Sequence, residues 1–265
     1  MKIWTIANQK GGVGKTTTTI TIASILARRG GRVLVVDLDP HGSLTSYLGH
    51  DPTDSGTGVY KAFIDSEHQP DEHIRSTKIA GVSVYKSSLM LATVDRSIGG
   101  APGKGLILKN TLNKLSARFD YVLIDCPPIL GTLMINALAA CEFLIIPSQA
   151  EFLSLNGLER MIETLAMVKK SIAKDLDYLI VPLMFDRRTK VSETCLGLMK
   201  EKYRDHIWRF VIPVDTRLRD ASREGVSVID LKGNSRSSIA YKQLLNDLLS
   251  RRKRIPVREV MKEAV

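Results

Sequence analysis

The sequence contains few cysteines and no long apolar run. Its three cysteines, Cys126, Cys141 and Cys195, are scattered and form no C-x-x-C pair. This spacing argues against a disulfide framework or an iron–sulfur site and favours a reducing cytoplasm. No apolar stretch approaches the roughly 18 residues that a membrane span needs. The first residues, MKIWTIANQK, do not form a signal peptide, because a strand-like run leads directly into a glycine-rich stretch.

The composition is that of a soluble globular protein with an excess of basic residues. A chain of 265 residues suits one large α/β domain or two small ones. The formal net charge is +10. Such a charge favours a polyanionic partner, either nucleic acid or an anionic membrane surface, although a solvated basic surface has the same composition.

Apolar, β-branched runs alternate with helical patterns along the chain. Continuous apolar runs are typical of a parallel sheet that is covered on both faces. The sequence therefore predicts an α/β fold with a doubly wound, mostly parallel sheet flanked by helices. The predicted strands are 2–7, 32–37, 121–125, 142–147, 178–183 and 208–212. The predicted helices are 15–29, 106–118, 155–173, 191–204 and 237–249.

Two segments fall outside this alternation. Residues 49–104 are rich in Gly, Ser, Asp and Pro, and we interpret them as an excursion between strands. Residues 251–265 form a basic C-terminal tail that contains Pro256. The remaining residues, 1–250, are then expected to form a single domain.

The stretch NQKGGVGKTTTT lies between the first predicted strand and the first predicted helix. Its glycines let the backbone curl so that successive N–H groups point at phosphate oxygens, and the following helix aims its positive end there. Lys15 would reach the β and γ phosphates of a nucleotide, and the Thr16 hydroxyl would ligate Mg²⁺. Gln9 replaces the first glycine of the usual G-x-x-x-x-G-K-[ST] pattern, and Lys10 is a second lysine inside the loop.

Acidic residues stand at the ends of two other predicted strands. Asp37 and Asp39 end VLVVDLD, and Asp125 ends YVLID. Because the carboxyl ends of parallel strands meet at one edge of a sheet, we expect these acids to converge on the glycine loop. One can hold Mg²⁺ through water and another can orient an attacking water. The sequence therefore predicts transfer of a phosphoryl group to water.

These motifs resemble those of the ParA/MinD family of partitioning and positioning ATPases. NQKGGVGKTT, VVDLDPHGS and VLIDCPPILG are similar to the family's deviant Walker A, Walker A′ and Walker B motifs, and the match extends through IPVDTRLRDAS. It covers nearly the whole chain. The resemblance implies a P-loop ATPase domain over residues 1–250 that uses ATP and Mg²⁺ and hydrolyses ATP slowly until a partner stimulates it.

The resemblance also implies roles for single residues. Lys10 matches the signature lysine, which reaches the nucleotide of the other subunit in an ATP-dependent homodimer. A lysine donated in this way makes charge compensation in the transition state conditional on dimerisation. The implied catalytic residues are Lys10, Lys15 and Asp39. The implied nucleotide-binding residues are Lys10, Gly11, Gly12, Val13, Gly14, Lys15, Thr16, Thr17, Asp125 and Pro213, and the implied metal ligands are Thr16, Asp39 and Asp125.

Two branches of the family differ in what they bind. One binds membranes through a C-terminal amphipathic helix, but the leucines of helix 237–249 are better explained by core packing. The other binds DNA non-specifically, and Arg188 and Arg217 resemble its DNA-contacting arginines. Such phosphate contacts are independent of sequence and sensitive to salt. A solvated basic face is the alternative.

The cargo is inferred from resemblance alone. VVDLDPHGSLTSYLGHDP is more similar to the ParA-like ATPases encoded beside chemotaxis genes than to segregators, which usually have glutamine and asparagine in place of His41 and Ser43. The resemblance therefore implies a cytoplasmic, nucleoid-associated ATPase that positions chemotaxis arrays at the cell pole through an adaptor. Chromosome or plasmid partitioning is the first alternative, and MinD-like membrane positioning is the second. A metabolic P-loop enzyme or a metal-cluster carrier would need substrate-specific acid–base residues or paired cysteines, which we do not find.

Overall fold

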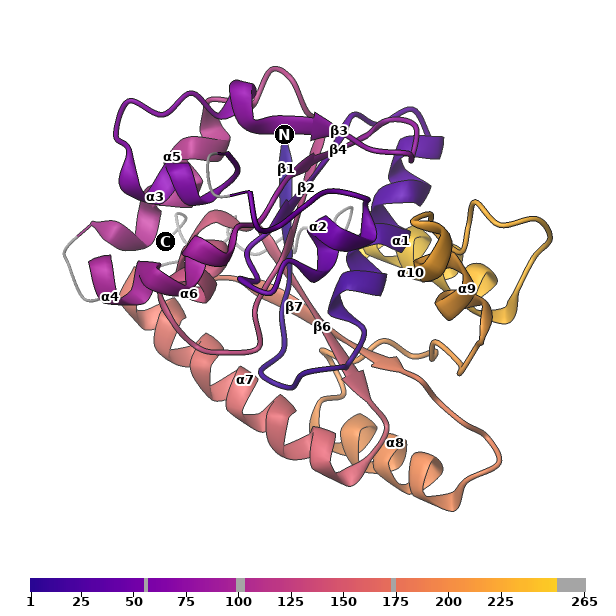
Figure 1. Ribbon diagram of the computed structural model, residues 1–265. Helices are drawn as coiled ribbons and strands as arrows, with labels where there is room; N and C mark the ends of the chain where they lie inside the picture. The colour runs from indigo at the N-terminus through magenta and orange to yellow at the C-terminus, as the bar shows by residue number, and fades with distance from the viewer. Residues whose placement is uncertain (55–56, 99–102, 173–174, 252–265) are drawn as a thin grey trace, which may run out of the picture.

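A single sheet forms the centre of the computed structural model, which describes residues 1–54, 57–98, 103–172 and 175–251 (Figure 1). Within these residues the sheet has seven strands in the order β3-β4-β2-β5-β1-β6-β7. All neighbours are parallel except β3 and β4. The predicted α/β fold is therefore confirmed. The strands are β1 (Lys2–Ile6), β2 (Val33–Asp37), β3 (Ile74–Ser76), β4 (Val82–Tyr85), β5 (Tyr121–Asp125), β6 (Phe143–Gln149) and β7 (Asp177–Leu183).

Helices cover both faces of this sheet, as Figure 1 shows. The longest helix in the described part of the chain is α7, which follows β6 directly and runs beneath the sheet edge. The α-helices are α1 (Lys15–Arg28), α2 (Ser43–Tyr47), α3 (Tyr60–Ile64), α4 (Val94–Ile98), α5 (Ile107–Asn113), α6 (Thr132–Ala140), α7 (Phe152–Ile172), α8 (Lys190–Lys202), α9 (Arg217–Glu224) and α10 (Arg236–Arg251). Short 3-10 helices occupy Pro70–His73, Leu89–Thr93 and Lys104–Leu106.

The core consists of two apolar layers, one on each face of the sheet. Because successive side chains of a strand point to opposite faces, Leu34 and Ile124 pack with α5, α6 and α7, whereas Val35 and Leu123 pack with α1 and α10. The predicted role of the C-terminal leucines agrees with this packing, since α10 buries Leu244, Leu245 and Leu248. No helix of the described residues has the length and apolarity needed to cross a membrane.

The predicted strand 208–212 does not form. The segment instead lies along β7, where Trp208 N donates to Ile180 O at 2.8 Å and Ile212 N donates to Pro182 O at 2.9 Å. Pro182 has no N–H, so the ladder cannot continue between these two bonds. Arg209 and Phe210 leave the sheet and are exposed at this point.

The interpretation of residues 49–104 was incomplete. Within this range β4 pairs with β2, and β3 pairs antiparallel with β4 at the sheet edge. These strands are only four and three residues long, which is too short for a clear apolar pattern. Helices α6 and α9 were also not predicted, and the predicted helix 106–118 shortens to α5. The basic tail lies outside the described residues from position 252 onwards.

Candidate functional site

The glycine loop connects β1 to α1 at the carboxyl edge of the sheet (Figure 1). Gly12 and Gly14 have φ angles of +72° and +85°, a region that residues with a side chain rarely adopt. A Cβ atom on Gly14 would lie 2.9 Å from Leu183 Cδ2, so the loop packs directly against the end of β7. Val13 is fully buried and Gly11 is exposed. The loop is thus anchored by one apolar side chain and presents its glycine backbone outward.

Lys15 begins α1 and turns back into the loop. Its Nζ atom donates to Lys10 O at 3.1 Å, and only 8% of its surface is exposed. Burial lowers the pKa of Lys15, although the charges of Asp125 and Asp39 act in the opposite direction. A buried ammonium group at a helix N-terminus, inside a curl of backbone, is placed to hold an anion. Thr17 lies half-buried on the same helical turn.

Two buried carboxyl groups lie side by side next to this turn. Asp37 and Asp125 are register partners on the adjacent strands β2 and β5. Burial and the charge of Asp37 raise the pKa of Asp125 to about 8. Burial likewise raises the pKa of Asp37 to about 7, although hydrogen bonds from Thr45 favour its ionised form. The two carboxyl groups therefore stay protonated at pH values well above those at which an aspartic acid usually ionises.

The oxygen atoms around Asp125 fit a hard cation. Thr16 Oγ1 donates to Asp125 Oδ2 at 2.6 Å. Asp125 Oδ1 is buried and has no hydrogen-bond partner among the described residues. A buried, unpartnered carboxylate oxygen beside a threonine hydroxyl is the kind of oxygen pair that Mg²⁺ binds directly or through water. Thr16 and Asp125 therefore fit the predicted metal site.

Asp39, the third predicted metal ligand, lies half-buried in the turn that follows β2. Its Oδ1 atom accepts a hydrogen bond from His41 N at 3.0 Å. Its backbone oxygen accepts one from Ser87 Oγ at 2.6 Å. Asp39 influences the pKa of both Lys15 and Asp125 through its charge. The predicted acids and the loop lysine are thus brought to one place.

Lys10 points away from this centre, toward the start of α7. Its Nζ atom pairs with Glu151 and donates to Ser154 Oγ at 2.9 Å and to Gln149 Oε1 at 3.5 Å. The hydrogen bond from Lys10 lowers the pKa of Glu151. Both side chains of the pair are partly exposed, at 24% for Lys10 and 46% for Glu151. The second lysine of the loop is therefore held within its own chain at a position close to solvent.

The residues that hold Lys10 and the loop in place were not identified from the sequence. Asn8 donates to Pro147 O at 2.7 Å and accepts from Lys10 N at 3.0 Å. Gln149 donates to Gly12 O at 3.1 Å. Asn8 begins the glycine motif, and Gln149 lies two residues after the predicted strand 142–147. Neither position shows in the sequence that β6 and the loop are in contact.

Pro213, the predicted adenine contact, lies beside a large groove. Its backbone pairs with Phe185, which follows the residues of β7 that contact the glycine loop. The groove has a volume of about 1160 Å³ and begins near this point. Its lining near Pro213 consists of Phe185, Asp186, Val214, Asp215 and Thr216. Pro213 is thus linked to the loop through Phe185 and the end of β7.

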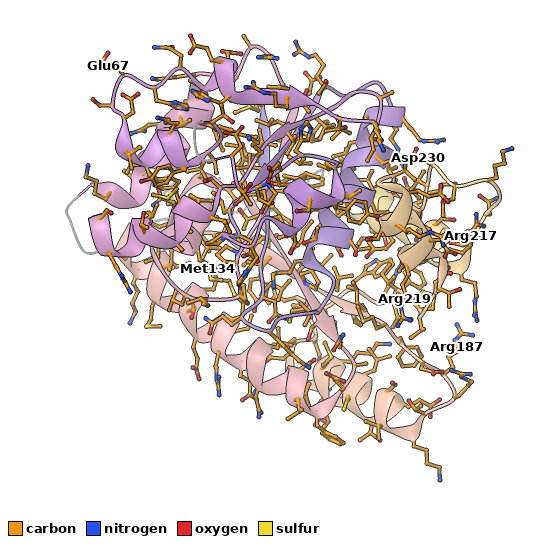
Figure 2. All side chains as sticks on the ribbon, in the orientation of Figure 1. Glu67, Met134, Arg187, Arg217, Arg219 and Asp230 are labelled. Carbon is orange, nitrogen blue, oxygen red and sulfur yellow. The ribbon has the colours of Figure 1, made fainter. Side chains whose placement is uncertain are left out.

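The two predicted DNA-contacting arginines differ in their surroundings. The side chain of Arg188 is 86% exposed and pairs with Asp186 at 2.7 Å. Arg217 is half-buried, and its guanidinium group donates to the backbone oxygens of Gly233 and Lys232. Figure 2 shows Arg217 on the same side of the molecule as Arg187 and Arg219, both of which are exposed. A basic face therefore exists, although Arg217 also stabilises a loop.

Known proteins are similar to this chain over nearly its whole length. A family model described as an AAA domain matches residues 1–178. The sporulation initiation inhibitor protein Soj of Bacillus subtilis is 36% identical over 248 residues, which cover 93% of this chain and 98% of Soj. The chromosome partitioning protein ParA of Caulobacter vibrioides is 33% identical over 254 residues, which cover 95% of each chain. A crystal structure of cobyrinic acid a,c-diamide synthase from Mycobacterium smegmatis, with a bound ATP analogue and magnesium, has a TM-score of 0.82 and 32% identity and covers 96% of both chains.

The raised pKa of Asp125 predicts how stability depends on pH without ligands. The folded protein binds a proton at this carboxyl group more tightly than the unfolded chain does. The resulting stabilisation is present at acidic pH and is lost as the pH rises toward about 8. Asp125→Asn is neutral at every pH, so its free energy of unfolding should fall less steeply between about pH 5 and pH 8.5. Urea denaturation in EDTA measures this difference.

Asp120→Asn is the matched control. The side chain of Asp120 is 43% exposed, and hydrogen bonds from Arg32 lower its pKa to about 2. A depressed pKa contributes stability that is lost only as the pH falls through that value, so this substitution should leave the slope between pH 5 and 8.5 unchanged. An equally steep slope in wild type and Asp125→Asn would contradict the buried-carboxyl account.

Proposed function

The chain belongs to the ParA/Soj family of P-loop ATPases, and from this membership we propose that it is an ATP-dependent dimerisation switch in chromosome or plasmid partitioning. One observation carries the proposal. The glycine loop holds two lysines that face different ways, Lys15 buried inside the loop and Lys10 at its outer edge. This arrangement suits one lysine that serves the chain's own nucleotide and one that serves the nucleotide of a second copy.

The other site residues have separate roles in this proposal. Lys15 and the backbone N–H groups of the loop bind the β and γ phosphates of ATP. Thr16 and Asp125 hold Mg²⁺, which neutralises charge on the phosphates when bound. Asp39 orients the attacking water, and Pro213 lies against the adenine. Hydrolysis converts the dimer back into monomers and so ends each cycle.

Exposed apolar side chains at the carboxyl edge of the sheet support dimerisation through this face. Ile129, in the loop after β5, is 71% exposed, and Leu153, at the start of α7, is 75% exposed. Their neighbours Leu130 and Phe152 are also exposed. The strands β5 and β6 that precede them flank β1 and its glycine loop on both sides. A second copy placed across the loop would cover these side chains and remove them from water, which favours association.

The relatives favour partitioning over the positioning of chemotaxis arrays that the sequence motifs imply. One relative is a chromosome partitioning protein, and its similarity spans 95% of this chain. Array positioning stays a second candidate because His41 and Ser43 differ from the usual pattern of segregators. Both residues are exposed, His41 in the turn that follows Asp39 and Ser43 at the start of α2, where a partner protein can contact them. For either function we propose two further proteins. A partner protein stimulates hydrolysis, and an adaptor protein links the ATPase to its cargo.

Removal of the hydrolytic acid separates binding from turnover. We expect Asp39→Ala to bind ATP and to form dimers, with phosphate release slower by about 10²-fold or more. Lys15→Ala should instead lose ATP binding or productive dimerisation. Light scattering on a size-exclusion column with ATP measures the dimer, and phosphate release without any other substrate measures turnover. Rapid turnover by Asp39→Ala would overturn the assignment.

Release of Lys10 from its own chain should make dimerisation easier. Glu151→Gln removes the charge that holds Lys10, so we expect half-maximal dimerisation at a roughly 2- to 5-fold lower ATP concentration, as suits a partly exposed ion pair. Glu159→Gln is the control, because Glu159 lies on α7, which begins directly after Glu151, but pairs with Lys202 of α8. The proposal for Lys10 fails if the two variants dimerise alike, or if Lys10→Ala dimerises as well as wild type.

DNA binding through the basic face is part of the same proposal. Arg188→Glu combined with Arg217→Glu should lose ATP-dependent DNA binding, and the dependence of binding on salt should weaken by about one unit of slope for each lost contact. ATP-dependent dimers should persist. Because the Arg217 guanidinium group also donates to the backbone oxygen of Lys232, a thermal melt must show that the variant is folded. Arg118→Glu is the control for the change in net charge, because Arg118 precedes β5 and so lies near the amino ends of the strands. Unchanged DNA binding across a salt titration would show that this face is not used.

A further inference from the structure

A closed ring of hydrogen bonds surrounds the backbone of Asp39. Asp39 N donates to Asp37 Oδ1 at 3.1 Å, and Asp39 O accepts from Ser87 Oγ at 2.6 Å. Ser87 N donates to Thr45 Oγ1 at 2.8 Å. Thr45 Oγ1 and Thr45 N both donate to Asp37 Oδ2, at 2.7 and 2.8 Å. The N–H of Asp39 is therefore fixed by Asp37 at the end of β2. Its C=O is fixed by Ser87, two residues beyond β4, and also accepts from Gly42 N in the same turn at 2.8 Å.

Apart from Asp39, the members of this ring are closed off from solvent. Asp37, Thr45 and Ser87 are all fully buried. In a dry environment a hydroxyl that loses its partner leaves an unsatisfied polar group, so the ring resists rearrangement. The side chain of Asp39, by contrast, bonds only the nearby His41 N in the contacts of the described residues. Its position is set mainly by its backbone and therefore by the ring.

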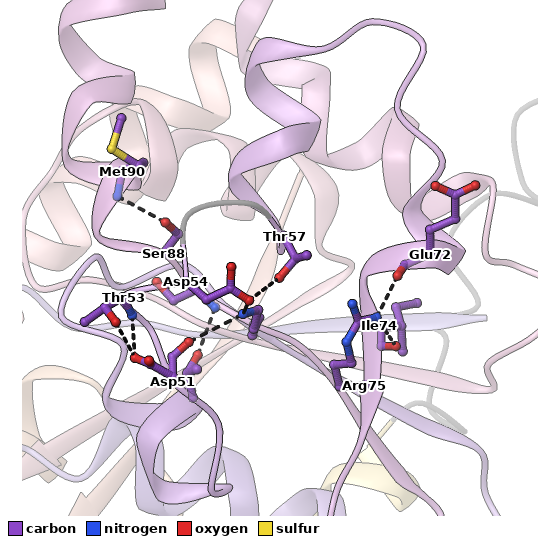
Figure 3. Close-up of polar contacts among 12 residues, drawn as sticks. Asp51, Thr53, Asp54, Thr57, Glu72, Ile74, Arg75, Ser88 and Met90 are labelled. Carbon is purple, nitrogen blue, oxygen red and sulfur yellow. Dashed lines mark hydrogen bonds and ion pairs between the residues drawn. The ribbon is translucent and has the colours of Figure 1, made fainter.

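The ring is held from outside by the segment that connects α2 to α3. Lys86, beside Ser87, is only 4% exposed and donates from Nζ to Asp54 Oδ2 at 2.6 Å and to Asp51 O at 3.4 Å. Figure 3 shows Asp51 and Asp54 together with their threonine partners in this segment. On the other side of the ring, a Cβ atom on Gly42 would lie 2.3 Å from Pro52 Cβ. The segment thus packs directly against the turn that carries Asp39.

We propose that Ser87 and Thr45 are positioning residues that hold Asp39 in the place required for ATP hydrolysis. Ser87 fixes the carbonyl group of Asp39 directly. Thr45 links Ser87 to Asp37, and Asp37 fixes the N–H group of Asp39. Both hydroxyl groups are buried and bond members of the ring. The inference rests on the proposed function, in which Asp39 orients the attacking water.

Single substitutions test this role against a merely structural one. Ser87→Ala removes the side-chain hydrogen bond to Asp39 O, leaves the bond from Gly42 N to that oxygen, and keeps the backbone N–H that donates to Thr45 Oγ1. We expect kcat for ATP hydrolysis to fall by roughly 10- to 100-fold, because small displacements of a catalytic group are costly, while KM for ATP and ATP-dependent dimerisation change less than about 2-fold. Thr45→Val should act in the same way, and Thr45→Ser, which keeps the hydroxyl, should restore most of kcat.

Ser88→Ala is the matched control. Ser88 is also fully buried and follows Ser87 directly, but its hydroxyl accepts from Met90 N and takes no part in the ring. Its loss should leave kcat within about 2-fold of wild type. The inference is overturned if Ser87→Ala hydrolyses ATP at the wild-type rate, or if Ser88→Ala lowers kcat as much as Ser87→Ala does.

A double substitution separates the failure of this inference from that of the proposed function. If Ser87 acts through Asp39, Ser87→Ala should not slow hydrolysis further in the Asp39→Ala background. A further loss of similar size in that background would mean an independent, structural role and would overturn the inference. Rapid turnover by Asp39→Ala itself would overturn the proposed function, whereas an inactive Asp39→Ala with a fully active Ser87→Ala would overturn only the inference.

Discussion

The adjacent burial of Asp37 and Asp125 is the constraint on which the rest of the site depends. Parallel pairing of β2 with β5 makes the two residues register partners at the strand ends, and packing of α1 removes water from both. Two neighbouring carboxyl groups cannot both ionise in such a place without compensation. Thr45 provides it for Asp37 through hydrogen bonds, and Lys15 provides part of it for Asp125 through its charge.

The two carboxyl groups therefore have different roles. Asp37 has donors on both oxygens and serves the structure of the turn that holds Asp39. Asp125 has one donor, Thr16, and one buried oxygen without a partner among the described residues. The second carboxyl group is therefore the one with capacity left for a cation. A cation bound there would favour the ionised carboxylate, so binding of a metal would release a proton.

The sequence predicted the parts of the structure that depend on local pattern. The glycine loop, the long apolar strands and the acids at their ends follow from residue type and spacing, so their convergence could be expected from parallel topology alone. Contacts between segments that are far apart in the sequence could not be predicted in this way. Ser87 lies two residues after β4, a strand that is too short to recognise from its sequence. Glu151 pairs with Lys10 because β6 ends beside the loop. The misassigned strand at Trp208 failed for a different reason, since Pro182 on the neighbouring strand withholds a donor.

The two lysines of the loop also differ in how easily each can change partners. Lys15 is buried, so its removal from the loop would expose a site built around its charge, and its contacts are expected to persist through a cycle. The pair formed by Lys10 and Glu151 is partly exposed, and such pairs contribute little to stability because water competes for both charges. Exchange of Glu151 for a nucleotide phosphate on a second copy would therefore cost little. A loop in which one lysine is fixed and the other is free to exchange is physically suited to couple nucleotide binding to dimerisation.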